Sequence, residues 1–199
     1  MSDWEKWISA DDLPLLAKAA MGHYWFETLH PFSDGDGRPG RLVVVLQLIY
    51  TGALRYPTLD ISPWLEARKD EYQDQLLRLS ESGEPGPWLE FFFGAVHHQA
   101  DDAVARIEKI VQIREWMRAA LKRAKARGVV LDLVDDLIAY PMITASLAAR
   151  LHSVTYPPSN AAIQKLVELG FLTETTGRND GRIFACREIM AAVEGPLRT

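Results

Sequence analysis

Twelve residues near the start of the chain, from His30 to Arg41, combine side chains suited to phosphate chemistry. They read HPFSDGDGRPGR, with one imidazole, two carboxylates, three glycines and two guanidinium groups. Histidine is the side chain that most readily acts as a base near neutral pH, and Asp34 supplies a hard oxygen ligand suited to Mg²⁺. Gly35 and Gly37 let the backbone turn and let a ligand approach the main chain closely. Together these are the parts of a nucleotide-phosphate site with a base and a metal.

The apolar run from Leu42 to Tyr50 follows directly and must position this segment. Three consecutive valines favour a buried strand, whereas a run that is apolar all round is equally typical of a buried helix. If the run is a helix, its first N–H groups favour an anion at the glycine-rich turn. Arg38 and Arg41, three residues apart, would then share a face and reach the same phosphates. Propensity alone leaves strand and helix open.

Each of these residues also has an interpretation without chemistry. A D-G-D-G sequence is most often a tight turn with solvated carboxylates. His30 alone is more often a packed or surface histidine than a base. His23 falls on an apolar helical stripe, where a satisfied core histidine is the commoner case. Only the complete set at this spacing favours a phosphate site over a simple turn.

The segment resembles the signature of the Fic family, His-x-Phe-x-Asp/Glu-Gly-Asn-Gly-Arg-x-x-Arg. Every fixed position matches except one, where Asp36 stands in place of asparagine. Residues 23–29, HYWFETL, resemble the helix that leads into the motif, and the resemblance continues through Arg68 and Tyr72 to residues 88–92, WLEFF. It covers roughly the first half of the chain.

This resemblance implies transfer of AMP from ATP to a Ser, Thr or Tyr hydroxyl of a target protein, with Mg²⁺ as cofactor. It implies that His30 is the base, that Asp34 is the metal ligand, and that residues 42–50 form a helix. The residues that it implies for nucleotide binding are Gly35, Asp36, Gly37, Arg38 and Arg41. In autoinhibited relatives, an inhibitory glutamate occupies the arginine equivalent to Arg41.

Two departures from the family pattern matter. Asp36 adds a carboxylate beside the phosphates, which is unfavourable by roughly 1–4 kcal/mol at about 4 Å unless Asp36 joins Asp34 on the metal. We therefore expect altered metal dependence or weaker ATP affinity, and unchanged binding and activity in Asp36→Asn would contradict this. About thirty residues precede His30, so we expect no upstream flap hairpin and no inhibitory helix in cis, which leaves an inhibitory helix in trans.

Composition limits the class of protein. The chain has 199 residues, of which 48% are hydrophobic, and its net charge of −5 argues against a protein that coats nucleic acid. A single cysteine, Cys186, excludes an internal disulfide and a cysteine-rich metal site, and fits a reducing cytoplasm. Apolar runs are shorter than the ~18 residues that span a bilayer. We expect a cytoplasmic protein with no membrane partner.

The first half of the chain reads as helical. Ser9 or Asp11 would cap a helix that begins near Leu13 and ends near residue 29, with Trp4 and Trp7 on a short amphipathic piece packed against it. Ser62 would cap a helix over residues 63–80, and the glycine- and proline-rich residues 82–87 interrupt it. A long helix then begins at residue 88. On it, His97 and His98 are adjacent, so they face about 100° apart and read as structural or surface residues.

The pattern changes after residue 128. Helices are expected over residues 131–139, 144–151 and 160–169, the last capped by Ser159 after a turn at 156–158. A β-hairpin is expected around residues 176–181. This order resembles a winged helix-turn-helix. The predicted fold is therefore mainly α, a Fic-type helical bundle followed by a small α+β winged-helix domain. The predicted divisions are a Fic-like catalytic domain at 1–108, a basic helical linker at 109–127 and a winged-helix domain at 128–199.

The partner of the second domain stays open. Residues 128–199 hold six Lys/Arg and eight Asp/Glu, a formal charge of −2, which suits duplex DNA poorly. Side chains of the expected recognition helix and wing could still contact bases and phosphates: Ser159, Asn160, Gln164, Lys165, Arg178 and Arg182. A protein-interaction or homodimerisation module is equally consistent. The alternatives to an AMP transferase are a winged-helix regulator with a degenerate Fic half and a partner in a toxin–antitoxin-like pair.

Overall fold

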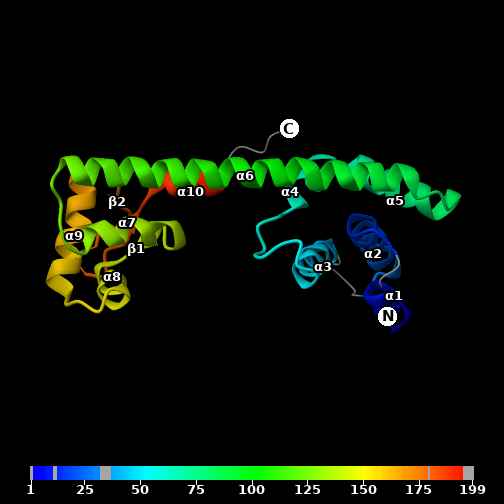
Figure 1. Cartoon of the computed structure of the whole chain (residues 1–199), viewed down its shortest axis with the longest axis horizontal. Helices are drawn as coiled ribbons and strands as arrows, with labels where there is room; N and C mark the ends of the chain where they lie inside the picture. The colour runs from blue at the N-terminus through cyan, green and yellow to red at the C-terminus, as the bar shows by residue number, and fades with distance from the viewer. Residues whose placement is uncertain (1, 11–12, 32–36, 179, 195–199) are drawn as a thin grey trace. The chain divides into compact units, whose positions relative to one another are not determined.

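The computed structural model describes residues 2–10, 13–31, 37–178 and 180–194. Within these ranges it has ten helices and three short strands, which form one sheet (Figure 1). The expectation of a mainly helical fold with a small sheet is confirmed. No helix of the described part is long and apolar enough to cross a membrane. The chain divides into two compact units, Met1–Ala103 and Val104–Pro196, and each has its own hydrophobic core.

The first unit begins with helices α1 (Ser2–Ser9) and α2 (Leu15–Leu29). The expected packing of a tryptophan-bearing piece on the second helix is confirmed. The indole N–H of Trp4 donates to the Gly22 carbonyl oxygen at 3.1 Å, and the rings of Trp4 and Phe26 lie 5.6 Å apart. This contact fixes α1 on α2 through both an aromatic pair and a hydrogen bond.

The expected caps of α2 differ from the structure. Pro14 precedes the helix, where its fixed φ suits the entry to a helix and its missing N–H is not needed. Ser9 is the last residue of α1, and its hydroxyl donates to the Glu5 carbonyl oxygen. Ser9 as a cap was therefore wrong, and Asp11 lies outside the described residues.

Helix α3 (Gly37–Tyr50) contains the run that could have been strand or helix. The helical expectation is confirmed. Val44 and Leu48 are buried while Leu42 and Leu46 are exposed, so burial follows the four-residue spacing of one helical face. Packing of α3 against α2 overrides the strand propensity of the valines.

The single helix expected over residues 63–80 is two helices, α4 (Ser62–Ala67) and α5 (Lys69–Ser82). Arg68, with φ −124° and ψ 38°, breaks the helical geometry between them. Ser62 is not the N-cap but the first helical residue, and its N–H donates to Asp60 Oδ1 at 2.9 Å. The break and the shifted start each depend on the backbone conformation of one residue. The periodicity of hydrophobic residues in the sequence does not reveal that conformation.

Helix α6 (Gly86–Arg123) begins after the expected break, and Gly83, with φ 72°, ends α5. The start of α6 supplies aromatic side chains to the core of the first unit. Trp88 and Phe92 are fully buried, and the Trp88 indole N–H donates to the Ala20 carbonyl oxygen at 3.0 Å. This bond holds α6 against α2, the helix that ends at His30.

The second unit comprises the end of α6 and seven further elements. These are α7 (Val130–Ala139), β1 (Met142–Ile143), α8 (Ala145–Leu151), α9 (Tyr156–Glu168), β2 (Thr173–Glu174), β3 (Phe184–Ala185) and α10 (Arg187–Glu194). The strands are antiparallel in the order β1-β3-β2, with Met142 and Thr173 both opposite Ala185. The expected hairpin is confirmed as β2 and β3, whereas β1 and α10 were not predicted. Helices α7 and α8 both pack on α9 (Figure 1).

The core of the second unit includes residues from α6. Ile113, Met117 and Leu121 are buried in it, beside Leu133 of α7 and Phe184 of β3. These three residues belong to the segment 109–127 that was read as a basic linker. Their spacing of four residues places them on one face of α6, so the same helix carries a basic face and a core face.

Two expectations at the start of α9 were wrong. The expected turn is instead the first part of α9, formed by Tyr156, Pro157 and Pro158. Proline is tolerated there because the first N–H groups of a helix have no partner within the helix. Ser159 is not a cap. It is fully buried, and its hydroxyl lies 2.9 Å from the Ala145 carbonyl oxygen and 2.8 Å from that of Tyr156. Ser159 therefore links α9 to α8.

Candidate active site

The residues predicted for the phosphate site fall into two groups. His30, Gly37, Arg38 and Arg41 are described, whereas the predicted metal ligand and two nucleotide-binding residues lie outside the described residues: Asp34, Gly35 and Asp36. The described residues come from the end of α2 and the start of α3. The geometry of the site is therefore given by how these two helices meet.

His30 follows α2 directly. Its backbone is left-handed, with φ 43° and ψ 60°, and its N–H donates to the Phe26 carbonyl oxygen at 3.2 Å. A left-handed residue other than glycine is uncommon and turns the chain sharply out of the helix. The His30 residue is exposed. Helix α2 is thus followed directly by an exposed histidine, at the beginning of the motif that the sequence identifies.

Arg38 and Arg41 lie near the start of α3 and line the same pocket, which has a volume of about 260 Å³. Their three-residue spacing brings both guanidinium groups to one side of the helix, as the sequence predicts. The pocket is completed by residues of α3, of the loop before α4 and of the first position of α4: Leu42, Val45, Pro57, Leu59, Asp60 and Ser62. Within the described part of the chain, His30 is not among the lining residues. Two cations on an open, partly apolar pocket are suited to a phosphate-bearing ligand.

Glu66 of α4 lies close enough to Arg41 to compete with a phosphate for its guanidinium group. Its Oε1 lies 3.7 Å from Nη1 of Arg41, whose side chain is 17% exposed, while that of Glu66 is 64% exposed. A phosphate that binds Arg41 must share the guanidinium with this carboxylate or displace it. Sequence reasoning missed the pair because α3 and α4 are separated by a loop, and Glu66 is only one of many helix-surface acids.

A buried pair of polar side chains lies beneath α3. Nε2 of His23 is 3.0 Å from the Tyr72 hydroxyl oxygen, and His23 is completely buried. Burial lowers the pKa of His23 to about 4 and raises the pKa of Tyr72 above its usual value. Both side chains are therefore neutral near pH 7. The prediction that His23 is a core histidine is confirmed, and Tyr72 packs beside it against Trp88.

Gly40 sets how closely α3 approaches α2. A Cβ at this position would lie 2.4 Å from Glu27 Oε1 and 3.2 Å from the His23 ring. The Glu27 carboxylate can move, but the buried His23 ring has little room to do so. Glycine here lets the first turns of α3, with Arg38 and Arg41, sit directly over the buried pair.

The described residues contain no group of three or more His, Cys, Asp or Glu that could hold a metal ion. A single carboxylate together with substrate phosphates is a common way to hold Mg²⁺, so the donor that the sequence offers, Asp34, fits that mode. The adjacent histidines of α6 are structural or surface residues, as expected. His97 is exposed beside Asp101, and the ring of His98 stacks on that of Trp64.

Comparison with known proteins finds similarity in the first part of the chain. Residues 1–48 match the sequence model of the Fic/DOC family. Two curated relatives are both named "Protein adenylyltransferase Fic": one from Culex quinquefasciatus is 32% identical over 104 residues, and one from Aedes aegypti is 30% identical over 104 residues. Each match covers 51% of this chain and 19% of the relative, so the chain spans about a fifth of those proteins.

Among solved structures, the crystal structure of a Fic family protein from Desulfovibrio desulfuricans G20 is similar to 93% of this chain and 53% of that chain. The sequence identity is 20% and the TM-score is 0.47. The family match covers α1, α2 and most of α3, the helices that carry His30, Arg38 and Arg41. The family model and the curated relatives together support a Fic/DOC family domain in the N-terminal part of this chain.

Proposed function

We propose that this chain is a protein adenylyltransferase, which moves AMP from ATP to a Ser, Thr or Tyr hydroxyl of a target protein. The observation that carries the proposal is the pair of arginines that line one pocket at the start of α3, together with the exposed His30 that follows α2. The names of the matched relatives support the same activity. ATP as substrate and a protein as acceptor follow from it.

The reaction needs one proton acceptor and several phosphate ligands. An imidazole nitrogen of His30 takes the proton of the target hydroxyl as its oxygen attacks the α-phosphorus. The new bond joins that oxygen to the α-phosphorus, and the bond from the α-phosphorus to the α,β-bridging oxygen breaks, so pyrophosphate leaves. Arg38 and Arg41 hold the outer phosphates. Backbone N–H groups of Gly37 and Arg38, the first residues of α3, cradle the anion.

Mg²⁺ bound by Asp34 would offset negative charge on the phosphates of ATP. The carboxylate of Asp36 is the feature that separates this chain from the family pattern. Because it adds negative charge beside the phosphates, we propose that it weakens ATP affinity or changes the metal requirement. Glu66 acts in the same direction, since its carboxylate lies 3.7 Å from Arg41.

The transfer reaction is tested by incubating the full chain with ATP labelled at the α-phosphate, Mg²⁺ and a cell extract as the source of acceptor proteins. Label on protein is expected with the unmodified chain and is expected to be lost with His30→Ala. His97→Ala is the matched control, because it removes an exposed imidazole from α6 and should leave labelling unchanged. Labelling that survives in His30→Ala, or no labelling and no ATP binding by the unmodified chain, would refute the proposal.

We also propose that residues 128–199 form a winged-helix module. The order α7, β1, α8, α9, β2, β3 and the antiparallel sheet support this assignment. For regulation of the chain, we propose an inhibitory helix supplied in trans. We also propose that the chain forms a homodimer. A cytoplasmic location is proposed on the single cysteine, which is buried and reduced.

A further inference from the structure

The compact units divide the charge of the chain very unevenly. The first unit, residues 1–103, holds eight Lys/Arg and seventeen Asp/Glu, a formal charge of −9. The second unit, residues 104–196, holds thirteen Lys/Arg and ten Asp/Glu, a formal charge of +3. The value of −2 for residues 128–199 omitted the basic segment of α6, which packs into the core of this unit. The electrostatic objection to a polyanionic partner therefore does not apply to the folded unit.

The positive charge is concentrated where α6 ends and the chain turns into α7. Lys122, Arg123, Lys125 and Arg127 are all exposed, and no acidic residue lies between them. Among the described residues, none of the four takes part in an ion pair. We call these four residues the basic turn. The negative end of the α6 dipole accounts for cations at 122 and 123, but residues 125 and 127 lie beyond the helix.

Lys125 is held in an unfavourable backbone conformation. Its φ is 50°, and it follows α6 in a helix-ending turn in which the Ala126 N–H donates to the Leu121 carbonyl oxygen at 3.0 Å. Glycine is the residue usually found at such a left-handed position, since a side chain there costs about 1 kcal/mol. A lysine at this place destabilises the turn slightly but fixes where its side chain leaves the backbone.

Two pockets adjoin the basic turn and share Lys125 and Arg127. One, of about 530 Å³, lies between the turn and α9 and reaches Lys165. The other, also about 530 Å³, lies along α6 and α7, where Asp132 is its one acidic lining residue. Lys165 forms an ion pair with Glu168, with Nζ 3.0 Å from Oε2. The net positive charge of the first pocket therefore comes mainly from the turn.

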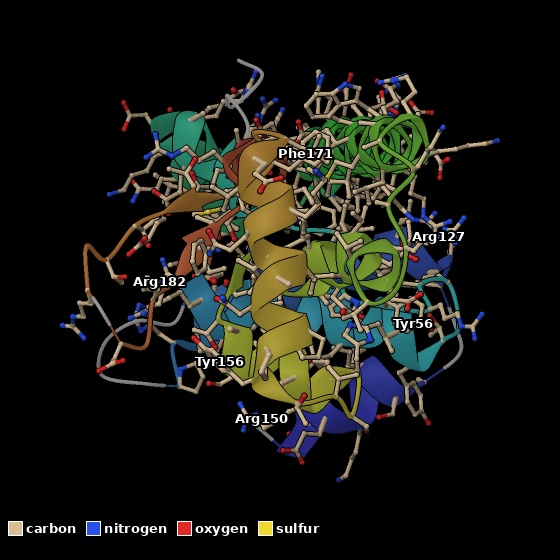
Figure 2. All side chains as sticks on the ribbon, turned by 90° about the vertical axis from the view of Figure 1, so that its left-hand side faces the viewer. Tyr56, Arg127, Arg150, Tyr156, Phe171 and Arg182 are labelled. Atoms are coloured by element: carbon tan, nitrogen blue, oxygen red, sulfur yellow. The ribbon has the colours of Figure 1, made fainter. Side chains whose placement is uncertain are left out.

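The neighbourhood of α9 indicates what the basic turn would bind. Figure 2 shows α9 facing the viewer, with Arg127 on one side of it and Arg182 on the other. Tyr156, at the exposed start of α9, and Arg150, at the end of α8, lie below. A helix of this kind fits the major groove of B-form DNA, and cations on both sides of it would meet the phosphates that border the groove.

We propose that the basic turn is a phosphate-binding surface that holds the backbone of duplex DNA beside α9. The pocket between the turn and α9 receives the phosphates, and Lys125 and Arg127 are its principal cations. Because phosphates are the same in every sequence, the turn contributes affinity and not sequence preference. This site lies wholly in the second unit and does not depend on AMP transfer.

The test measures binding of the full chain to a fluorescent duplex of about 20 base pairs at salt concentrations between about 50 and 200 mM. Anisotropy should show binding that weakens steeply with salt. Lys125→Gln with Arg127→Gln should lower affinity about tenfold at low salt and reduce the slope of log K against log[salt] by about two. Lys109→Gln removes one exposed cation of α6 far from the turn, which is half the charge change of the double variant; it is the control and should change neither.

Lys125→Gly separates binding from folding. It removes one cation and also relieves the left-handed strain, so the variant should be at least as stable as the unmodified chain and yet bind DNA more weakly. The proposal is overturned if the unmodified chain does not bind duplex DNA, if it binds single strands or anionic vesicles equally well, or if the Gln variants bind as tightly as Lys109→Gln. None of these results would bear on labelling by ATP.

Discussion

The buried pair of His23 and Tyr72 shows how single residues support the candidate site without touching a ligand. Their hydrogen bond joins α2 to α5, and the His23 ring lies against Gly40 at the start of α3. The imidazole is uncharged near pH 7 because burial strongly disfavours its charged form and lowers its pKa. Because burial lowers the pKa of His23, the stability of the first unit depends on pH.

We predict that acid destabilises the first unit through His23. Its pKa is about 4 when folded and about 6.5 when unfolded, so below pH ~6.5 the unfolded state binds a proton that the folded state does not. Stability should therefore be unaffected above pH ~7 and should fall as the pH drops from about 6.5 to about 4, by about 3 kcal/mol in total.

Urea unfolding of the full chain, followed by tryptophan fluorescence at several pH values, measures this effect. Trp88 stacks on His23 with ring centroids 6.1 Å apart, and five of the six tryptophans lie in the first unit, so the signal reports mainly on that unit. His23→Gln keeps a hydrogen-bonding side chain but does not titrate, and should flatten the pH dependence. An equally steep decline in His23→Gln would assign the acid sensitivity to other groups.

At the level of elements, the short helix α8 of the second unit depends on a single capping residue. The Oγ1 atom of Thr144 accepts a hydrogen bond from the Leu147 N–H at 3.1 Å and so caps α8, which is only seven residues long. Because α8 packs on α9 and Thr144 directly follows β1, the cap also fixes the entry from sheet to helix.

We predict that Thr144→Ala destabilises the second unit by about 1 kcal/mol, the typical loss for an N-cap. Thr144→Ser keeps the hydroxyl and should retain most of the stability. Amide hydrogen exchange of α8 and α9 distinguishes the two variants. If alanine and serine protected these amides equally, the hydroxyl would not be what stabilises the start of α8.

At the scale of the whole molecule, the chain has two separate hydrophobic cores, one in each compact unit. The core of the first unit includes Trp88 and Phe92 from the start of α6, while that of the second includes Met117 and Leu121 from the same helix further along. The two units also carry opposite formal charge. An acidic unit proposed to act on nucleotide is thus joined in one chain to a basic unit proposed to bind DNA.

Separate cores predict separate responses to a core substitution. Met117 is completely buried, so Met117→Ala should destabilise the second unit by about 2–5 kcal/mol through the lost contacts and the cavity. Hydrogen exchange should then speed up for amides at Leu133 and Phe184 and stay unchanged at Phe92. Equal acceleration at all three would mean that the units unfold as a single cooperative structure.

The sequence by itself determined which chemistry the chain can offer. The residues from His30 to Arg41 predict a phosphate site. The helical spacing of α2, α6, α7 and α8 could be read directly, since periodicity is a local property. The β2–β3 hairpin was also predictable, because glycine, asparagine and aspartate mark its turn. The roles of the motif residues stay predictions.

Only the tertiary structure decided the features that depend on long-range contacts. Residues 42–50 are helical because α3 packs on α2, and β1 exists because β3 lies beside it. The contact of Glu66 with Arg41 and the bond of Tyr72 to His23 join segments that the sequence keeps far apart. The same holds for the basic turn. Its local charge pattern predicts a linker, whereas burial of the opposite face of α6 makes it part of a folded unit.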